Sequence, residues 1–328
     1  MPLSRVRSSL RLLCPAKINL HLRVGPRRAD GFHPLLSWMC TVGLFDTLTL
    51  RPSRARAFPG GTEAPAGALR TTLECEPAGL PCDEQNLVVR VANAWPGYAG
   101  SEDASIEARL TKRTPVGAGL GGGSSNAARM VLALDRLFPR SGGGRSATEL
   151  AAFAARFGSD VPFFLAGPSS VCAGRGEIVR PVANPRPGWA VLVLPDVMMP
   201  TPDVYRHFDA LGLGSPDDIE REPDWSDWAA RDALSLLPLL VNDLEPPAFA
   251  IRPELGELRS DIQRILGRPV RMSGSGSSLF TLFDEAEEAR LAAEKLSRTP
   301  SGLKIRIEAV ELAPILHDDL RAGDFNCH

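Results

Sequence analysis

The 328-residue sequence lacks the features of several specialised classes of protein. It has no continuous apolar run near the roughly 18 residues that a membrane-spanning helix needs. Its 37 Lys and Arg residues are balanced by 39 Asp and Glu residues, so the net charge is only −2 and no overall positive field attracts nucleic acid or acidic lipid. We therefore expect a soluble globular protein that binds neither nucleic acid nor membranes.

Disulfide and metal-binding motifs are also missing. Six cysteines are spread along the chain without any C-x-x-C pair: Cys14, Cys40, Cys75, Cys82, Cys172 and Cys327. The five histidines include no H-E-x-x-H motif, so the sequence predicts neither a disulfide framework nor a metal site. The N-terminus has no small-residue cleavage site and indicates no signal peptide. These absences favour the cytoplasm, and lysine is itself scarce, with only four residues.

Glycine and proline are abundant, with 30 and 29 residues, and they mark the loops. They cluster at residues 52–67, 139–144, 184–188 and 212–223. The first and last of these segments have no apolar periodicity and are predicted to be surface insertions. The length suits two compact domains. We place the boundary within residues 166–188, so that residues 1–175 form the first domain and residues 176–328 the second.

Hydrophobic periodicity predicts strands and helices in both halves. Residues 17–24 alternate between apolar and polar side chains, which indicates a half-buried strand with Lys17 on its polar face. Further strands are expected at residues 37–43, 47–51, 69–74, 105–112, 189–194, 270–272, 278–283 and 304–312. Helices are expected at residues 86–95, from 124 or 125 to 138, and at 148–157, 254–266 and 285–296. The predicted fold class is α+β.

The strongest local signal is a glycine-rich segment directly before a predicted helix. Its candidate binding residues are Pro115, Gly117, Gly119, Leu120, Gly121, Gly122, Gly123, Ser124 and Ser125. Glycine lets the backbone approach an anion closely, and the N–H groups and dipole of a helix N-terminus favour phosphate. The segment therefore predicts a phosphate-binding loop. A flexible linker followed by a helix cap is the plain alternative.

Two known phosphate-binding motifs fit this loop poorly. A Walker A loop needs Lys at the position where Gly123 stands, just before Ser124. Three glycines do satisfy the dinucleotide pattern G-x-G-x-x-G, but the acidic residue about twenty positions later would be Asp135, which lies inside the predicted helix. A dinucleotide oxidoreductase is therefore disfavoured.

Three other segments have ordinary explanations when each is taken alone. The turn Ser273-Gly-Ser-Gly276 suits a tight hairpin between two predicted strands. Asp160 precedes an apolar run and suits a helix cap or a turn. Lys17 suits a solvated charge at a strand edge.

The order of five motifs along nearly the whole chain is more specific than any one of them. The motifs are Pro15-Ala-Lys-Ile-Asn-Leu20, Arg28-Ala-Asp-Gly-Phe-His33, the glycine-rich loop, Gly158-Ser-Asp-Val-Pro162 and Ser273-Gly-Ser-Gly276. Together they resemble the GHMP superfamily of small-molecule kinases. The resemblance implies two α+β domains with the active site in the cleft between them. ATP would place its phosphates on the glycine-rich loop, and the turn with Gly274 and Gly276 would help to close the site.

Within this superfamily, the first two motifs followed by the glycine-rich loop resemble the kinases that act on a cytidine-bearing alcohol, and this narrower resemblance implies a reaction. The γ-phosphoryl group of ATP would move to the 2-hydroxyl of 4-diphosphocytidyl-2-C-methyl-D-erythritol, a step of the non-mevalonate isoprenoid route. Asp160 matches the catalytic base of the family, and Lys17 matches the lysine beside it. A carboxylate suits a poorly nucleophilic tertiary alcohol because it accepts the proton, while a cation stabilises the migrating charge. Mg²⁺ is expected to shield the phosphates, although no protein ligand for it is evident.

The family positions that hold the cytidine-bearing substrate fall on Asn19, Phe32, His33 and Tyr205. Phe32 and Tyr205 would sandwich the cytosine ring while His33 reads its edge. Phe32 stands where many relatives have Tyr, and Tyr205 also suits the core face of a helix. The adenine and ribose positions fall on Asn86 and Lys112, and Asn86 equally suits a helix N-cap.

Two other functions stay open at this point. A GHMP kinase for a mevalonate-like or homoserine-like alcohol would share the motifs, but the segment Asp30-Gly-Phe-His33 favours a cytidine site. A non-catalytic nucleotide or metabolite sensor would share the fold, yet it would need neither Lys17 nor Asp160. We therefore expect an ATP-dependent small-molecule kinase. The sequence does not predict its oligomeric state.

Overall fold

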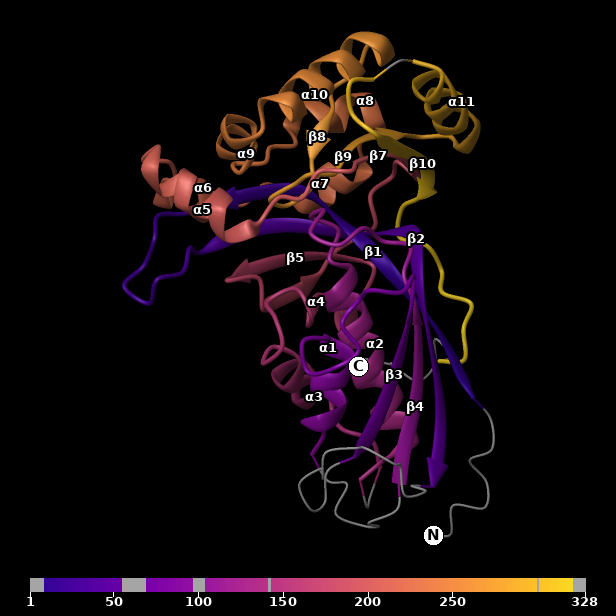
Figure 1. The fold of residues 1–328 in the computed structure, drawn as a ribbon. Helices are drawn as coiled ribbons and strands as arrows, with labels where there is room; N and C mark the ends of the chain where they lie inside the picture. Colours follow the sequence, from indigo (N-terminus) through magenta and orange to yellow (C-terminus); the bar gives the residue numbers. More distant parts are fainter. Residues whose placement is uncertain (1–8, 55–68, 97–103, 141–142, 300, 321–328) are drawn as a thin grey trace.

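The structure, a computed structural model, describes residues 9–54, 69–96, 104–140, 143–299 and 301–320. Two α+β parts lie one above the other (Figure 1). We call them the N-terminal part, which contains the first sheet and helices α1 to α4, and the C-terminal part, which contains the second sheet and helices α5 to α11. Among the described residues no helix is both long and apolar enough to cross a membrane.

Within the described ranges, the first sheet has six strands in the order β3-β4-β2-β5-β6, with β1 paired to β2. Its strands are β1 (Leu10–Val24), β2 (Leu35–Arg54), β3 (Arg70–Glu76), β4 (Ala104–Thr111), β5 (Ser169–Gly174) and β6 (Ile178–Pro181). The pair β3 and β4 is parallel and the other pairs are antiparallel. The β1–β2 hairpin is long, and its register shifts between Pro15 and Ala16 and again between Asn19 and His21.

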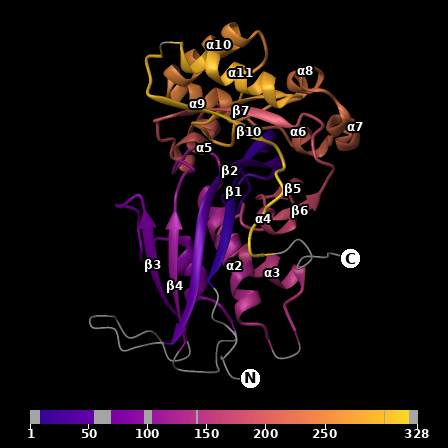
Figure 2. The same ribbon diagram turned by 90° about the vertical axis from the view of Figure 1, so that its right-hand side faces the viewer.

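The helices of the N-terminal part lie on one side of strands β2, β3 and β4, as Figure 2 shows for α2 and α3. They are α1 (Leu87–Asn93), α2 (Gly122–Leu137), α3 (Ala147–Ala154) and α4 (Phe163–Ala166). Helix α2 is the central one, because Ala127, Met130 and Val131 are buried in the same apolar core as Leu48 and Leu50 of β2. This packing fixes the direction in which the N-terminus of α2 points.

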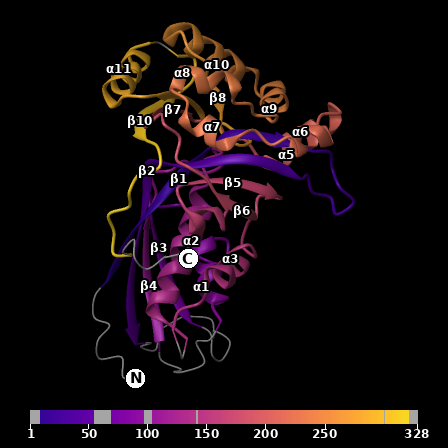
Figure 3. The ribbon, with the colours of Figure 1, turned by 180° about the vertical axis from the view of Figure 1, so that it is seen from behind.

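The second sheet is antiparallel, in the order β10-β7-β9-β8. Its strands are β7 (Trp189–Pro195), β8 (Arg271–Met272), β9 (Leu279–Phe283) and β10 (Ile305–Glu311). Its helices are α5 (Thr201–Ala210), α6 (Pro216–Glu220), α7 (Trp225–Ala230), α8 (Ala233–Leu236), the 3₁₀ turn η1 (Leu237–Leu239), α9 (Glu245–Ile251), α10 (Pro253–Leu266) and α11 (Ala286–Ser297). Helices α10 and α11 lie at the outer end of the molecule (Figure 3).

A shared apolar cluster joins the two parts. Ile18 of β1 and Trp38 of β2 belong to the same buried cluster as Leu192 of β7 and Phe280 of β9. His21 lies beside this cluster and accepts a hydrogen bond from a backbone N–H, and its burial lowers its pKa to about 3. The parts therefore meet through continuous packing, and the uncharged His21 belongs to that packing.

The structure corrects the prediction that residues 17–24 form a half-buried strand. The strand begins earlier, at Leu10, and its polar face is buried from Lys17 to His21, since Lys17 is 4% exposed and Asn19 is 3% exposed. The physical reason is tertiary. Lys17 donates its backbone N–H to Leu120 of the glycine-rich loop, and Asn19 donates its own to Ser273 of the C-terminal part, so both neighbours cover this face.

Three loop boundaries also differ from the prediction. The segment 212–223 contains helix α6, because Ser215 caps its N-terminus and Pro216 occupies its first turn. Helix α2 begins at Gly122 and not at Ser124 or Ser125. In the segment 52–67, residues 52–54 belong to β2, and the rest lies outside the described residues.

The two-domain division itself remains a proposal. Strand β6 pairs with β5 of the first sheet, so a boundary after residue 175 would divide this hairpin. A boundary in residues 182–188, within the range that the loop composition favours, keeps the first sheet whole.

Candidate active site

A cavity of about 1230 Å³ opens between the two parts. It is lined by β1, the glycine-rich loop, the turn before α4, helix α5 and the turn at residues 274–275. All of the predicted site residues line it except Ser125 and Gly276. Ser125 is fully buried in α2, and a side chain at Gly276 would meet Met272. The motifs that the sequence scatters over the chain thus meet around one space.

The glycine-rich loop connects β4 to α2 and is tightly enclosed. Gly119 and Gly121 have φ angles of +76° and +65°, a region that favours glycine. A Cβ atom at Gly119 would lie 2.2 Å from the carbonyl oxygen of Ser273, and one at Gly121 would lie 2.9 Å from Cγ of Lys17. The N-terminus of α2 has no side-chain cap in the described structure. Its backbone N–H groups therefore suit an anionic ligand.

A buried carboxylate anchors the start of this loop, and sequence analysis missed it. Asp46 of β2 is fully buried and accepts hydrogen bonds from four donors: Lys112 Nζ at 2.5 Å, Arg113 N at 2.8 Å, Thr114 N at 2.9 Å and Asn126 Nδ2 at 3.0 Å. These bonds tie the chain leaving β4 to helix α2. Lys112 therefore lines the cavity and also forms a structural ion pair with Asp46 through its ammonium group.

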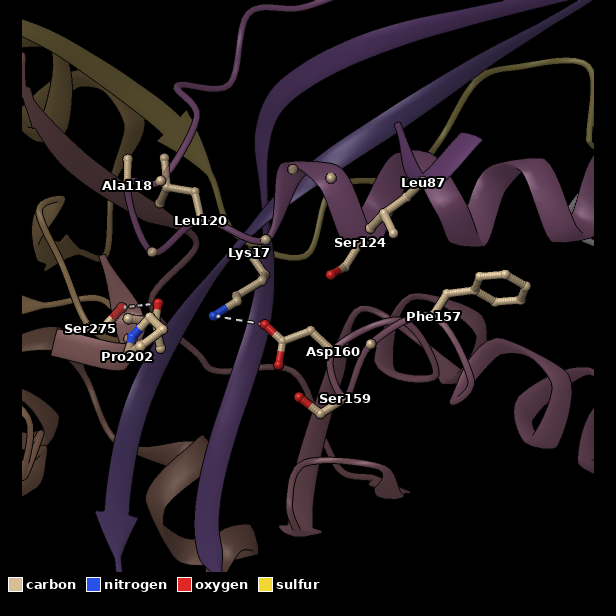
Figure 4. A pocket seen from close by; sticks show the side chains of 18 of the residues that line it. Lys17, Leu87, Ala118, Leu120, Ser124, Phe157, Ser159, Asp160, Pro202 and Ser275 are labelled. Atoms are coloured by element: carbon tan, nitrogen blue, oxygen red, sulfur yellow. Dashed lines mark hydrogen bonds and ion pairs between the residues drawn. The ribbon is translucent and has the colours of Figure 1, made fainter. Parts of the chain in front are cut away.

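Lys17 and Asp160 face each other at the centre of the cavity. Figure 4 shows them pointing toward one another, with Ser124 of α2 close by. Lys17 Nζ lies 3.4 Å from Asp160 Oδ2, and the Lys17 side chain is 5% exposed. Lys17 Nζ also donates to Asn19 Oδ1 at 2.5 Å. The lysine is thus directed by two oxygen acceptors.

The ordinary explanation fails for Lys17, and Asp160 occupies a turn without capping a helix. Lys17 is buried and does not lie at a solvated strand edge. Asp160 lies in the turn before α4, whose N-cap is Pro162 and has no side-chain cap bond.

Tyr205 of α5 also lines the cavity. Burial raises the pKa of Tyr205 to about 12, with the negative charge of Asp160 adding to the shift. Tyr205 therefore keeps its proton at neutral pH.

A surface turn carries Phe32 to the other end of the cavity. Arg28 N donates to Phe32 O at 2.8 Å, and Phe32 N donates to Asp30 Oδ1 at 3.1 Å. The hydrogen bond from the backbone N–H of Phe32 is the main reason that the pKa of Asp30 lies below its usual value. Phe32 itself is 52% exposed, and the guanidinium of Arg175 lies 4.8 Å from its ring centroid. The turn therefore presents the ring to the cavity and does not bury it in a core.

His33 follows this turn, and its ring is fixed from both sides. Nδ1 donates to Gly25 O at 2.9 Å, and Nε2 lies 3.1 Å from Asp209 Oδ1. Its centroid is 5.2 Å from that of Tyr205 on α5. Both ring nitrogens thus already have a partner, which limits the contacts that the ring can offer to a ligand.

Asn86 serves as the N-cap of α1. Its Oδ1 accepts from Val88 N at 3.0 Å, and its Nδ2 donates to Pro81 O at 2.9 Å. The residue also lines the cavity. The cap explains its side chain, and any contact with adenine stays a prediction.

This fold and cavity place the chain in the class of GHMP small-molecule kinases. Family models match it twice, as the GHMP kinases N terminal domain at residues 86–168 and as the GHMP kinases C terminal domain at residues 221–302. A mevalonate kinase crystal structure, at 11% identity, shares the fold with a TM-score of 0.61 and covers 92% of this chain and 99% of that one. The predicted GHMP fold and kinase class are confirmed.

Proteins of higher sequence identity identify the family within the GHMP kinases to which the chain belongs. A 4-diphosphocytidyl-2-C-methyl-D-erythritol kinase of Nocardioides sp. is 39% identical over 284 residues, covering 86% of this chain and 91% of the relative. The enzyme of that name from Thermus thermophilus is 38% identical, covering 87% and 91%. The crystal structure of a 4-(cytidine 5'-diphospho)-2C-methyl-D-erythritol kinase matches with a TM-score of 0.70 at 35% identity, covering 93% of this chain and 100% of that one. The chain belongs to the 4-diphosphocytidyl-2-C-methyl-D-erythritol kinase family.

Proposed function

We propose that the protein transfers the γ-phosphoryl group of ATP to the 2-hydroxyl of 4-diphosphocytidyl-2-C-methyl-D-erythritol, in the non-mevalonate isoprenoid route. The observation that carries this proposal is the Lys17–Asp160 pair, which faces the N-terminus of α2 within one cavity. The volume of about 1230 Å³ exceeds the usual size of a single-ligand pocket and suits two substrates bound side by side.

The two residues have complementary roles in this proposal. Asp160 accepts the proton of the substrate hydroxyl, since a tertiary alcohol attacks poorly without a base. Lys17 stabilises the charge that moves with the phosphoryl group, because phosphoryl transfer depends mainly on positioning and electrostatic stabilisation. The 3.4 Å separation lets one ammonium serve both the base and the reacting oxygens.

ATP occupies the side of the cavity formed by the glycine-rich loop. Its phosphates lie against the backbone from Gly117 to Gly123 and the N-terminus of α2, where N–H groups and the helix dipole favour anions. Asn86 and Lys112, on the same side, border the adenine and ribose.

Mg²⁺ belongs to this proposal because it neutralises phosphate charge during transfer. In the described part of the chain, no group of three or more His, Cys, Asp or Glu side chains is arranged to hold a metal ion. An ion held mainly by ATP phosphates and water fits this lining. The hydroxyl of Ser124, on the cavity wall, could supply one protein oxygen ligand.

The alcohol substrate occupies the opposite side of the cavity. Phe32 and Tyr205 enclose the cytosine ring, because flat aromatic faces select a flat base. Asn19 and Gly274 border the erythritol end, near Lys17.

A panel of acceptor alcohols tests the proposal. The protein is incubated with ATP, Mg²⁺ and either 4-diphosphocytidyl-2-C-methyl-D-erythritol, mevalonate or homoserine, and ADP release is measured. We expect release with the cytidine-bearing alcohol only. Release with another alcohol would redirect the substrate assignment, and nucleotide binding without any release would favour a sensor.

A further inference from the structure

A buried hydroxyl is connected to the Lys17–Asp160 pair through Asn19. Ser37 of β2 is fully buried and lies outside the cavity lining. Its Oγ accepts from Asn19 Nδ2 at 2.8 Å and donates to the backbone oxygen of His21 at 2.8 Å. These bonds form where the β1–β2 register shifts, between Asn19 and His21. The strand irregularity thus brings Ser37 within reach of the residue that contacts Lys17.

The donor and the acceptor can be assigned in each of the three hydrogen bonds that link Lys17, Asn19, Ser37 and His21. An ammonium only donates, so the Asn19 atom that lies 2.5 Å from Lys17 Nζ is the carbonyl Oδ1. The amide nitrogen therefore points the other way, toward Ser37. Ser37 has one hydroxyl proton, which it donates in a hydrogen bond to the His21 carbonyl, so its oxygen is left to accept from Asn19.

We propose that Ser37 is a positioning residue for phosphoryl transfer, which aims Lys17 at Asp160 by fixing the orientation of the Asn19 amide. This inference rests on the proposed roles of Lys17 and Asp160. Without the Ser37 hydroxyl, the Asn19 NH₂ group loses its buried acceptor. An unpaired buried donor is costly, and rotating the amide would turn that donor toward the Lys17 ammonium. Two facing donors repel, so Lys17 would leave its position beside Asp160.

The same sheet offers a matched control. Ser170 of β5 lies on the strand next to β2, opposite Met39, and is as fully buried as Ser37. Its hydroxyl has no hydrogen-bond partner in the described structure. Ser170→Ala therefore removes a buried hydroxyl from the same sheet without touching the Lys17 network.

Steady-state kinetics on the full chain test the proposal. We expect Ser37→Ala to lower kcat about tenfold, because a displaced Lys17 stabilises the migrating charge less well, while KM for both substrates stays within about twofold. Ser37→Thr, which keeps the hydroxyl, should retain kcat. Ser170→Ala should match the wild type, and thermal unfolding is recorded for each variant.

A double-mutant cycle separates positioning from a structural role. If Ser37 acts through Lys17, adding Ser37→Ala to Lys17→Met should cause no further loss of kcat. An equal loss in both backgrounds would overturn the proposal, and so would wild-type kcat in folded Ser37→Ala. If Ser37→Ala does not fold, Ser37→Cys keeps the volume with a weak hydrogen-bonding group and is held to the same outcomes. Full turnover in Lys17→Met would instead contradict the proposed role of Lys17.

Discussion

The two ends of the cavity are built differently. At the end where we propose phosphoryl transfer, called the reaction end below, the Lys17 side chain is 5% exposed and is fixed by Asn19 and Asp160. At the end that we propose for the cytosine base, called the base end below, Phe32 is 52% exposed and stands on a surface turn with Arg175 near its ring. Geometry matters most where charge moves, because small displacements there cost rate. The reaction end is therefore preorganised, whereas the base end depends on contacts that a ligand completes.

The hydrogen bonds of the two ends differ in the same way. At the reaction end they join segments that are far apart in the sequence, since Ser273 Oγ donates to Gly119 O at 2.9 Å and accepts from Asn19 N at 3.2 Å. At the base end the turn is stabilised by the local hydrogen bond from Phe32 N to Asp30, and Asp209 of α5 contacts the ring of His33. Changes at the reaction end should thus lower turnover, and changes at the base end should lower affinity for the cytidine-bearing substrate.

The largest effect is expected for Asp160→Asn. The amide has nearly the same shape but cannot accept the proton, so turnover should fall by at least about a hundredfold while ATP affinity is kept. Calorimetric titration with ATP and steady-state rates measure the two effects. Asp261→Asn, on the exposed face of α10, is the control for removing a carboxylate. Near-normal turnover in a folded Asp160→Asn protein would remove Asp160 from the mechanism.

Gly121→Val should have the next largest effect, and it should act mainly on ATP. The position has φ of +65°, and its Cβ would lie 2.9 Å from Lys17 and 3.2 Å from Phe164. A β-branched residue there is strained and crowds the phosphate side, so ATP affinity should fall about tenfold or more, by more than stability does. Gly302→Val is the control, since a Cβ atom there meets no atom within 4 Å. Parallel losses of melting temperature and ATP affinity would indicate a structural role for Gly121.

Most of the residues that the sequence singled out line one cavity, and they could be recognised because they sit in short motifs. Lys17 and the glycine-rich loop each carry their signal within about ten neighbouring residues. The partners that hold them carry no such signal. Asp46 stands on the apolar face of its strand, between Leu44 and Leu48, but its donors come from 66 to 80 positions further along the chain. Only the folded sheet brings them together.

The burial of β1 was missed for a related reason. Alternation of polar and apolar residues normally marks a strand with one solvated face. Here the polar face of β1 meets the glycine-rich loop and Ser273, which is 254 residues from Asn19. Periodicity reports the chemistry of a face but does not report what covers it. The polar face of an apparently half-buried strand was therefore part of the cavity wall.

Phe32→Ala tests the base end. Stacking predicts a loss of roughly 1–3 kcal/mol in binding of the cytidine-bearing substrate, with no loss for ATP, whereas Phe32→Tyr keeps the ring and should be mild. Because Phe32 is half exposed, stability should change far less than the roughly 3–5 kcal/mol of a core phenylalanine. Paired ligand titrations and unfolding curves measure both quantities. A large stability loss with both ligands affected together would overturn the assignment of Phe32 to the pocket.

The smallest effect is expected for Asp209→Asn. Asp209 Oδ1 lies 3.1 Å from His33 Nε2, and its Oδ2 lies 3.7 Å from Arg27 Nη1. The carboxylate is one-third exposed, and exposed ion pairs contribute roughly 0–1 kcal/mol, so affinity for the cytidine-bearing substrate should fall only about twofold to fivefold. ATP affinity should not change, and Asp217→Asn, which removes a carboxylate from an exposed pair on α6, should change neither affinity. Unchanged affinity for both ligands in Asp209→Asn would mean that Gly25 and the edge contact with Phe208 suffice to hold the His33 ring.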